Sequence, residues 1–208
     1  MRLVCAHHKG GVGKTTLAVH TAALLANGIE RTLLMDCDSQ GDSFYFFARK
    51  YPAGQGDIVH LNNLDVYYNR DRVRLATLSN YDHLIVDIDT AFAHAMDVIQ
   101  QVNPNVILIP VNAQALAVLH LNDVLFMIAN AEGKSAYPAT VKVVPVGISK
   151  AGIVSVLKQA PKLPSVYKVM PRMKRLPKMD TALAEGRLIW TYPDFASLMG
   201  YFQSLVSC

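Results

Sequence analysis

The chain has 208 residues, of which 51% are hydrophobic and 17% are charged, and its formal net charge is +4. This length is sufficient for one well-packed domain, and so apolar a composition predicts a large core. Its apolar runs reach only about eight residues, which excludes a membrane-spanning helix of about 20 residues. Met1 and Arg2 lead directly into such a run, so we expect no signal peptide.

Short apolar runs alternate along the chain with helical patterns. Strands are expected at 2–7, 32–35, 84–86, 106–111, 141–146 and 166–170, and helices at 14–26, 43–49, 91–102, 115–129, 178–185 and 195–206. This order predicts an α/β fold over residues 1–208, a single-domain doubly wound, mostly parallel sheet with helices on both faces. Residues 52–82 are the least readable, with a loop near Gly54 and a short exposed helix at 69–75 as the interpretation.

The segment between the first expected strand and the first helix predicts phosphate binding. It reads Lys9-Gly10-Gly11-Val12-Gly13-Lys14-Thr15-Thr16. Its glycines permit positive φ angles and a close approach of the backbone to an anion. Lys14 is then expected to reach the β- and γ-phosphates, and the Thr15 hydroxyl to ligate Mg²⁺. The alternative is a glycine-rich turn with two solvated lysines.

The general phosphate-loop pattern requires a glycine at position 8, where this chain has His8. The eight residues K-G-G-x-G-K-T-T instead resemble the deviant Walker A motif of the ParA/MinD family of ATPases. This resemblance implies the P-loop NTPase fold, ATP/ADP and Mg²⁺ as cofactors, and nucleotide binding by the whole of residues 9–16. It also implies that Lys9 reaches across a nucleotide-sandwiched homodimer to the partner's ATP, so that Lys9 and Lys14 both act in catalysis.

Three aspartates follow expected strands and complete this site. Asp87 ends the apolar run 84–86, an arrangement typical of a Walker B carboxylate that holds Mg²⁺ directly or through water. The segment 36–42 resembles the family pattern D-x-D-P-Q-G-N, with Ser39 and Asp42 in place of the proline and the asparagine. By that resemblance Asp38 orients the attacking water and Asp36 supports the metal shell. The alternative is a strand-end turn that an aspartate caps.

The resemblance weakens further along the chain. After Asp87 the family's proline is missing and an extra carboxylate, Asp89, lies near the γ-phosphate or caps the next helix. Pro171 and Arg172 resemble the late segment that forms the adenine-side loop, which places both in the cofactor-binding set. The asparagine that recognises adenine is not evident in residues 146–150, so a preference for ATP over GTP rests on the resemblance alone.

Residues 150–187 carry a basic excess, with nine lysines and arginines against two acidic residues. Such a segregated field predicts a polyanion surface, although a merely solvated face is the simpler alternative. With the resemblance, it suggests an ATP-dependent dimerising switch ATPase that binds non-specific DNA. We expect it to drive plasmid or DNA partition with a centromere-binding adaptor protein that stimulates a slow hydrolysis, in the cytoplasm and on the nucleoid.

Three alternatives remain open or unfavoured. A conjugation-linked or plasmid-stability ATPase that acts through protein partners is not separable from partition. A MinD-like membrane-positioned ATPase requires an amphipathic C-terminal helix with basic residues, which 195–206 lacks. A metabolic or redox ATPase of the nitrogenase iron-protein type requires a pair of cysteines that holds a cluster at the dimer interface. Here Cys5 and Cys37 lie at the expected nucleotide site instead. We expect all three thiols to be inert, without a disulfide or a zinc site.

Overall fold

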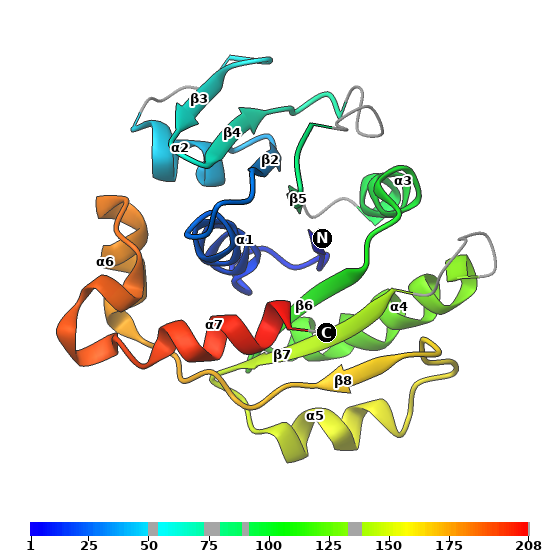
Figure 1. The fold of residues 1–208 in the computed structure, drawn as a ribbon. Coiled ribbons are helices and arrows are strands. Elements are labelled where there is room, and N and C mark those ends of the chain that lie inside the picture. Colours follow the sequence, from blue (N-terminus) through cyan, green and yellow to red (C-terminus); the bar gives the residue numbers. More distant parts are fainter. Residues whose placement is uncertain (50–53, 73–79, 89–91, 133–138, 208) are drawn as a thin grey trace.

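The computed structural model describes residues 1–49, 54–72, 80–88, 92–132 and 139–207. Within these residues, eight strands form one sheet in the order β3-β4-β2-β5-β1-β6-β7-β8 (Figure 1). The strands are β1 (Arg2–Cys5), β2 (Thr32–Cys37), β3 (Ile58–Leu61), β4 (Leu64–Tyr68), β5 (His83–Ile88), β6 (Val106–Asn112), β7 (Thr140–Val146) and β8 (Tyr167–Val169). Neighbouring strands pair in parallel, except for β3, which is antiparallel to β4. The predicted mostly parallel α/β sheet is therefore confirmed.

Helices cover both faces of this sheet (Figure 1). They are α1 (Lys14–Leu25), α2 (Asp42–Ala48), α3 (Phe92–Val102), α4 (Ala115–Ala131), α5 (Lys150–Leu157), α6 (Pro177–Glu185) and α7 (Leu198–Val206), with short 3₁₀ turns η2 (Ile189–Thr191) and η3 (Pro193–Phe195). Residues of α3, α4 and α5 share one core cluster, and residues of α1, α2, α6 and α7 share the other. The sheet is thus doubly wound, as predicted.

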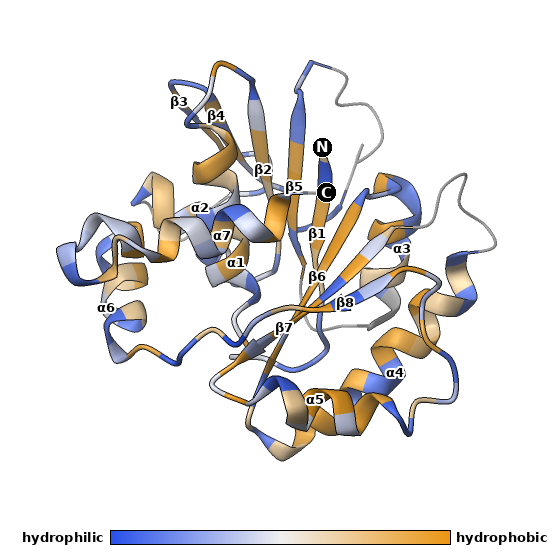
Figure 2. Cartoon of the chain, turned by 60° about the horizontal axis from the view of Figure 1, so that its bottom comes forward, coloured by the Kyte–Doolittle hydropathy of each residue, from blue (hydrophilic) through white to orange (hydrophobic). Residues whose placement is uncertain are grey.

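The central strands are mostly apolar, as expected for strands that are buried on both faces (Figure 2). In β1, Leu3 and Cys5 point toward α1, whereas Val4 points toward the opposite helix layer. Each of these side chains is fully buried. This placement fixes β1 in the middle of the sheet, between β5 and β6, and brings the residues that follow it to the carboxyl edge.

Helix α1 is tied to the last part of the chain through His20. The ring is fully buried, and its Nε2 accepts a hydrogen bond from the backbone N–H of Ile189 at 3.0 Å. Nδ1 therefore carries the proton and donates to the carbonyl of Thr16 at 2.7 Å. The ring stacks on Phe202 with 4.7 Å between centroids, and burial lowers the pKa of His20 to about 4. A neutral imidazole thus joins α1 to η2 and α7.

Several boundaries differ from the sequence-based expectation. The β3–β4 hairpin was missed because β3 is an exposed edge strand without alternation, turning through two asparagines at 62–63. Helix α5 was missed because Gly152 interrupts its pattern, although Ser149 caps it by accepting from the Gly152 N–H at 3.1 Å. The last helix begins at Leu198, after two 3₁₀ turns, rather than at 195. Residues 69–72 form a turn rather than a helix, and 73–75 lie outside the described residues.

Candidate nucleotide-binding site

The loop between β1 and α1 forms the centre of the site. Gly11 has φ 71° and Gly13, the N-cap of α1, has φ 113°, in the left-handed region that favours glycine. The chain therefore curls back on itself before α1 begins at Lys14. A helix N-terminus that opens from such a loop directs backbone N–H groups toward an anion.

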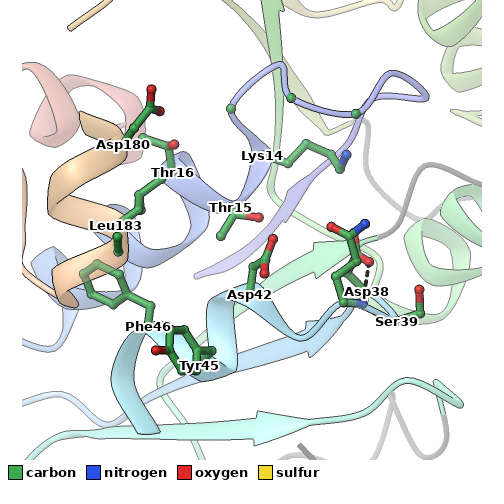
Figure 3. Close-up of a pocket in the computed structure, with 15 residues that line it drawn as sticks. Lys14, Thr15, Thr16, Asp38, Ser39, Asp42, Tyr45, Phe46, Asp180 and Leu183 are labelled. Atoms are coloured by element: carbon green, nitrogen blue, oxygen red, sulfur yellow. Dashed lines mark hydrogen bonds between the residues drawn. The ribbon is translucent and has the colours of Figure 1, made fainter. Parts of the chain in front are cut away.

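A cavity of about 670 Å³ lies beneath this loop. Lys14, Thr15 and Thr16 line it at the start of α1, and Figure 3 shows the Lys14 side chain running under the loop. Only 6% of Lys14 is exposed, so its ammonium group is held at the cavity rather than in bulk solvent. The volume lies within the range of small-molecule sites, about 300–1,000 Å³.

Two further elements wall this cavity, and the first of them includes the segment 36–42 that the sequence resemblance assigned to the site. One is the segment after β2 together with α2, and the other is α6, which packs near it (Figure 3). Their lining residues are Asp38, Ser39, Gln40, Asp42, Tyr45, Phe46, Asp180, Leu183 and Ala184. Of these, only Asp38 was predicted. Residues 182–186 resemble the family's late, adenine-side segment, and tertiary packing brings Leu183 and Ala184 of this segment to the cavity.

The strand pairing brings Asp36 and Asp87 together as register partners on β2 and β5. Asp36 is fully buried, and its two oxygens accept backbone hydrogen bonds from Asp38 (3.0 Å) and Phe44 (2.8 Å). Asp87 Oδ2 accepts a hydrogen bond from the Ser43 hydroxyl at 2.5 Å. Its Oδ1 is buried and has no hydrogen-bond partner within the part of the chain that the structure describes.

Burial dominates the electrostatics of this carboxylate pair. It raises the pKa of Asp87 to about 6, against the opposing influence of Ser43, Lys14 and Thr15. Burial and the charge of Asp87 together raise the pKa of Asp36 well above its ordinary value. Two adjacent buried carboxylates are unfavourable when both are ionised, and a divalent cation nearby reverses this effect.

The donor set fits Mg²⁺ that arrives with a phosphate. In the described ranges, no group of three or more histidine, cysteine, aspartate or glutamate side chains could hold a metal by itself. Mg²⁺ is usually bound through one or two carboxylates together with substrate phosphates and waters. Asp87 Oδ1 is a buried oxygen that is available to contact the metal. Both oxygens of Asp36 already accept hydrogen bonds, so we expect Asp36 to support the metal from its outer coordination shell.

Asp38 lies at the rim of the same cavity, half-buried, on the loop that leads into α2. Its Oδ1 accepts a hydrogen bond from the Gln40 N–H at 3.0 Å, which fixes the carboxylate (Figure 3). Asp42 also lines the cavity, and burial together with the charge of Asp38 raises its pKa. The site therefore contains two acidic groups near the phosphate loop besides the buried pair.

The remaining predicted residues lie around the cavity or beyond it. Lys9 is half-buried, its backbone N–H donates to His7 Nδ1 at 2.9 Å, and it is not among the residues that line the cavity. Val12 is buried in the core. The Pro171 carbonyl accepts a hydrogen bond from the Tyr201 hydroxyl at 2.9 Å, and Pro171 lines neither this cavity nor the one described next. The expectation for Asp89 falls on residues outside those described.

Arg172 lines a second hollow, also of about 670 Å³, beside the loop. Its other lining residues are Asn112, Ala113, Gln114, Val146, Gly147, Lys174 and Arg175, none of them acidic. The Asn112 side chain donates a hydrogen bond to the Gly11 carbonyl at 3.1 Å, which joins this basic hollow to the phosphate loop. Arg172 thus lies on the opposite flank of the loop from Asp36 and Asp87.

Curated relatives are similar to this chain over parts of their length. The chromosome partitioning protein ParA of Myxococcus xanthus is 54% identical over 43 residues, which is 20% of this chain and 15% of that protein. The maintenance of carboxysome distribution protein A of Gloeobacter kilaueensis is 37% identical over 87 residues, 42% of this chain and 38% of that protein. The aligned parts therefore span less than half of either relative.

Solved structures resemble the whole chain. The ATP complex of a Cyanothece McdA variant superposes with a TM-score of 0.78 at 20% identity, covering 98% of this chain and 94% of that one. A plasmid partition protein of Borrelia burgdorferi bound to AMPPNP gives 0.71 at 19% identity, covering 98% and 97%. A cobyrinic acid a,c-diamide synthase of Mycobacterium smegmatis with ADP and magnesium gives 0.61 at 20%, covering 88% and 91%. At these identities the likeness concerns the fold.

One family model matches most of the sequence. It is described as the CobQ/CobB/MinD/ParA nucleotide binding domain, and it covers residues 3–181, from β1 through the phosphate loop and both carboxylate strands into α6. The match, the fold and the loop geometry agree: the chain belongs to the CobQ/CobB/MinD/ParA nucleotide-binding domain family.

Proposed function

We propose that this protein is a switch ATPase that binds ATP or ADP with Mg²⁺ and forms a homodimer in the ATP state. The observation that carries the proposal is the phosphate loop above a cavity together with the buried Asp87, which interacts with the cavity-lining Lys14 and Thr15 and whose Oδ1 has no hydrogen-bond partner among the described residues. A loop of this kind binds phosphates, and a buried carboxylate with one unpaired oxygen beside it is stabilised in its ionised form by a cation. The family membership supports the same nucleotide chemistry.

The residues of the chain then have distinct roles. The backbone of residues 10–16 cradles the phosphates, and Lys14 neutralises charge on the β- and γ-phosphates. Thr15 and Asp87 hold Mg²⁺, with Asp36 in support, and the metal supplies further neutralisation of the triphosphate. Asp38, fixed by the Gln40 N–H, orients the attacking water. Phosphoryl transfer to water requires mainly this positioning and charge neutralisation.

Lys9 is proposed to act on the nucleotide of the partner subunit. Its absence from the cavity of its own chain supports this role, although Lys9 belongs to the same eight-residue motif as Lys14. A lysine supplied across a dimer couples association to the triphosphate state. Pro171 and Arg172 remain proposed for the adenine side of the nucleotide, although neither lines this cavity and Arg172 lines the basic hollow beside the loop.

The basic segment is proposed to bind DNA without sequence preference. Lys174 and Arg175 are exposed at the basic hollow, and Lys150, Lys158 and Lys168 are exposed on neighbouring elements. Contacts of lysine and arginine with phosphates require no base reading and weaken steeply with salt. The switch would then act on the nucleoid in the cytoplasm, with a protein partner that stimulates hydrolysis.

DNA partition with a centromere-binding partner is the proposed cargo, supported by the ParA and plasmid-partition likenesses. A second candidate cargo is a protein body, favoured by the likeness to a carboxysome-distribution protein. A role in conjugation through protein partners remains an alternative. A MinD-like membrane role is unsupported, because α7 contains neither lysine nor arginine. None of the described helices is long and apolar enough to cross a bilayer.

Hydrolysis and oligomeric state, measured together, test the proposal. Light scattering of the wild type with ATP and Mg²⁺ should give a dimer, and with ADP a monomer. Lys9→Ala should stay monomeric with ATP and still bind nucleotide, whereas Lys14→Ala should lose nucleotide binding. A Lys9→Ala protein that dimerises like the wild type would refute the role across the interface. A wild type that binds no ATP would refute the function.

A further inference from the structure

Helices α2 and α6 form two walls of the nucleotide cavity, and Arg49 joins them at their C-terminal ends. Phe46 of α2 and Ala184 of α6 both line the cavity. The Arg49 Nη2 donates a hydrogen bond to the Ala184 carbonyl at 2.7 Å. The same guanidinium lies over the Tyr45 ring, with Cζ 4.8 Å from the ring centroid. One side chain therefore contacts both walls.

The backbone at Arg49 is unusual for this residue type. Arg49 is the C-cap of α2 with φ 55°, in the left-handed conformation that favours glycine. Local preference therefore opposes an arginine here, and an outlier of this kind marks a position that serves another purpose. The Arg49 side chain contacts α6 through its hydrogen bond to the Ala184 carbonyl.

The end of α6 is adapted to the same contact. Gly186 is the C-cap of α6 with φ 64°. A Cβ at this position would lie 2.7 Å from Arg49 Nη1 and 2.6 Å from the Phe46 carbonyl oxygen. Only glycine allows the two helix ends to approach this closely without displacement.

The opposite end of α2 contacts the carboxylate pair. The Phe44 N–H donates to Asp36 Oδ2 at 2.8 Å, and the Ser43 hydroxyl donates to Asp87 Oδ2 at 2.5 Å. Helix α2 thus spans the distance between the proposed metal site and α6. A displacement of α6 from α2 would widen the cavity at one end and leave the phosphate end in place.

We propose that Arg49 is a positioning residue that clasps α6 to α2 and retains the bound nucleotide. This inference rests on the proposed function, because it requires the nucleotide to occupy this cavity. Opening the clasp provides the exit at the α6 wall, while Lys14 and Asp87 hold the phosphate end. Its loss therefore affects nucleotide release and KM, and not the hydrolysis step at saturating ATP.

Arg49→Met tests the clasp, because it keeps the length of the stem and removes the guanidinium donors. Dissociation of a fluorescent methylanthraniloyl-ADP should become about tenfold faster, the effect of one hydrogen bond from a charged group. KM for ATP should rise to a similar extent with kcat unchanged. Arg49→Lys should restore part of the retention. Arg187→Met is the matched control, since Arg187 stacks on Tyr192, with Cζ 4.1 Å from the ring centroid, and pairs with Glu185.

Two further variants separate the effect of the clasp on nucleotide release from its effect on protein stability. Arg49→Gly relieves the left-handed backbone, so it should unfold at a higher temperature than Arg49→Met and still release ADP quickly. Gly186→Ala should reproduce the rapid release from the α6 side. Unchanged release in both Arg49→Met and Gly186→Ala would overturn the proposal.

Hydrogen exchange distinguishes this inference from the proposed function. Without nucleotide, amides of residues 182–187 should exchange faster in Arg49→Met than in the wild type. If the wild type binds no fluorescent ADP, but the amides of residues 182–187 still exchange faster in Arg49→Met, the proposed function fails and the retention role is overturned with it. If the wild type binds ADP and exchange does not respond, only the clasp fails.

Discussion

On the side of β2 and β5 the phosphate loop faces buried carboxylates, whereas on the side of β6 and β7 it faces exposed cations. On the first flank, Asp36 and Asp87 accept hydrogen bonds of 2.5 to 3.0 Å and are almost closed to solvent. The second is an open hollow lined by Arg172, Lys174 and Arg175. Buried carboxylates that are held in a fixed geometry suit one metal ion of defined size. Exposed lysines and arginines suit a polyanion such as DNA, which can bind them in many alignments. The phosphate loop lies between the two flanks, so a nucleotide bound at the loop can influence both.

Removal of Lys14 should have the largest effect, because this cation is buried between the loop and the acidic flank. Lys14→Ala should weaken ATP binding by about 3 kcal/mol or more, about a hundredfold, as expected for the loss of a desolvated charge partner. Titration calorimetry with ATP and Mg²⁺ measures it. Lys9→Ala serves as the control, and equal losses in the two variants would remove the distinction between the two lysines.

Asp87→Asn tests the acidic flank through pH. Since the pKa of Asp87 is raised from 3.8 to about 6, the unfolded chain loses this proton at a lower pH than the folded protein. Without Mg²⁺, the free energy of unfolding should therefore fall as pH rises from about 4 to 6, by at most about 3 kcal/mol. Asp87→Asn should reduce this fall, of which the part due to the raised pKa of Asp36 remains, and it should weaken the stimulation of ATP hydrolysis by Mg²⁺.

Chemical denaturation at pH 4.5 and 7 with EDTA measures the effect, and a repeat with Mg²⁺ and ADP tests the role of the metal. Added Mg²⁺–ADP should stabilise the wild type more than Asp87→Asn. The same pH profile in both proteins would show that another group causes the fall.

DNA binding by the basic flank should depend on the salt concentration rather than on Mg²⁺. Lys174→Ala combined with Arg175→Ala should reduce the slope of log K against log salt for DNA binding by about 2, since each phosphate contact contributes about 0.9. The matched control combines Arg31→Ala with Arg70→Ala, which removes the same charge from exposed positions outside the basic segment 150–187. Equal slopes in the two double variants would assign the DNA surface to net charge alone. ATP binding should be unchanged in both.

The smallest effect is expected at the link between the flanks. Asn112→Ala removes the hydrogen bond to the Gly11 carbonyl, which should weaken ATP binding by about 1 kcal/mol, about fivefold. The coupling between ATP binding and DNA binding is more informative. In Asn112→Ala, ATP should enhance DNA binding less than it does in the wild type. Gel shift with and without ATP measures it. Full enhancement in Asn112→Ala would show that the two flanks communicate by another route.

The sequence predicts the phosphate loop and the sheet because both depend on local signals. Gly11 and Gly13 mark backbone positions with positive φ, and the apolar runs mark strands buried on both faces. The meeting of Asp36 with Asp87 also follows from the rule that parallel strands end at one edge. Their roles, like that of Lys9, stay predictions.

The parts that were missed depend on tertiary contacts. Tyr45, Phe46 and Asp180 line one cavity because α6 returns to α2 after more than a hundred residues of intervening chain. Edge strand β3 has no core face of its own, and α5 carries a glycine that weakens its helical pattern. For these elements the stabilising contacts lie elsewhere in the sequence, so no window of neighbouring residues contains the signal.

The imidazole of His20 bears on where a minimal fragment could be cut. The family match ends at residue 181, which would suggest a boundary inside α6. Yet the side of α1 that carries His20 is sealed by Ile189 and Phe202, both beyond that point. A truncation at the family boundary would leave a buried ring nitrogen without its donor and uncover an apolar surface directly behind the nucleotide loop. The last 20 or so residues therefore belong to the smallest unit that could fold and bind, and a shorter fragment should aggregate rather than act as a reduced version of the protein.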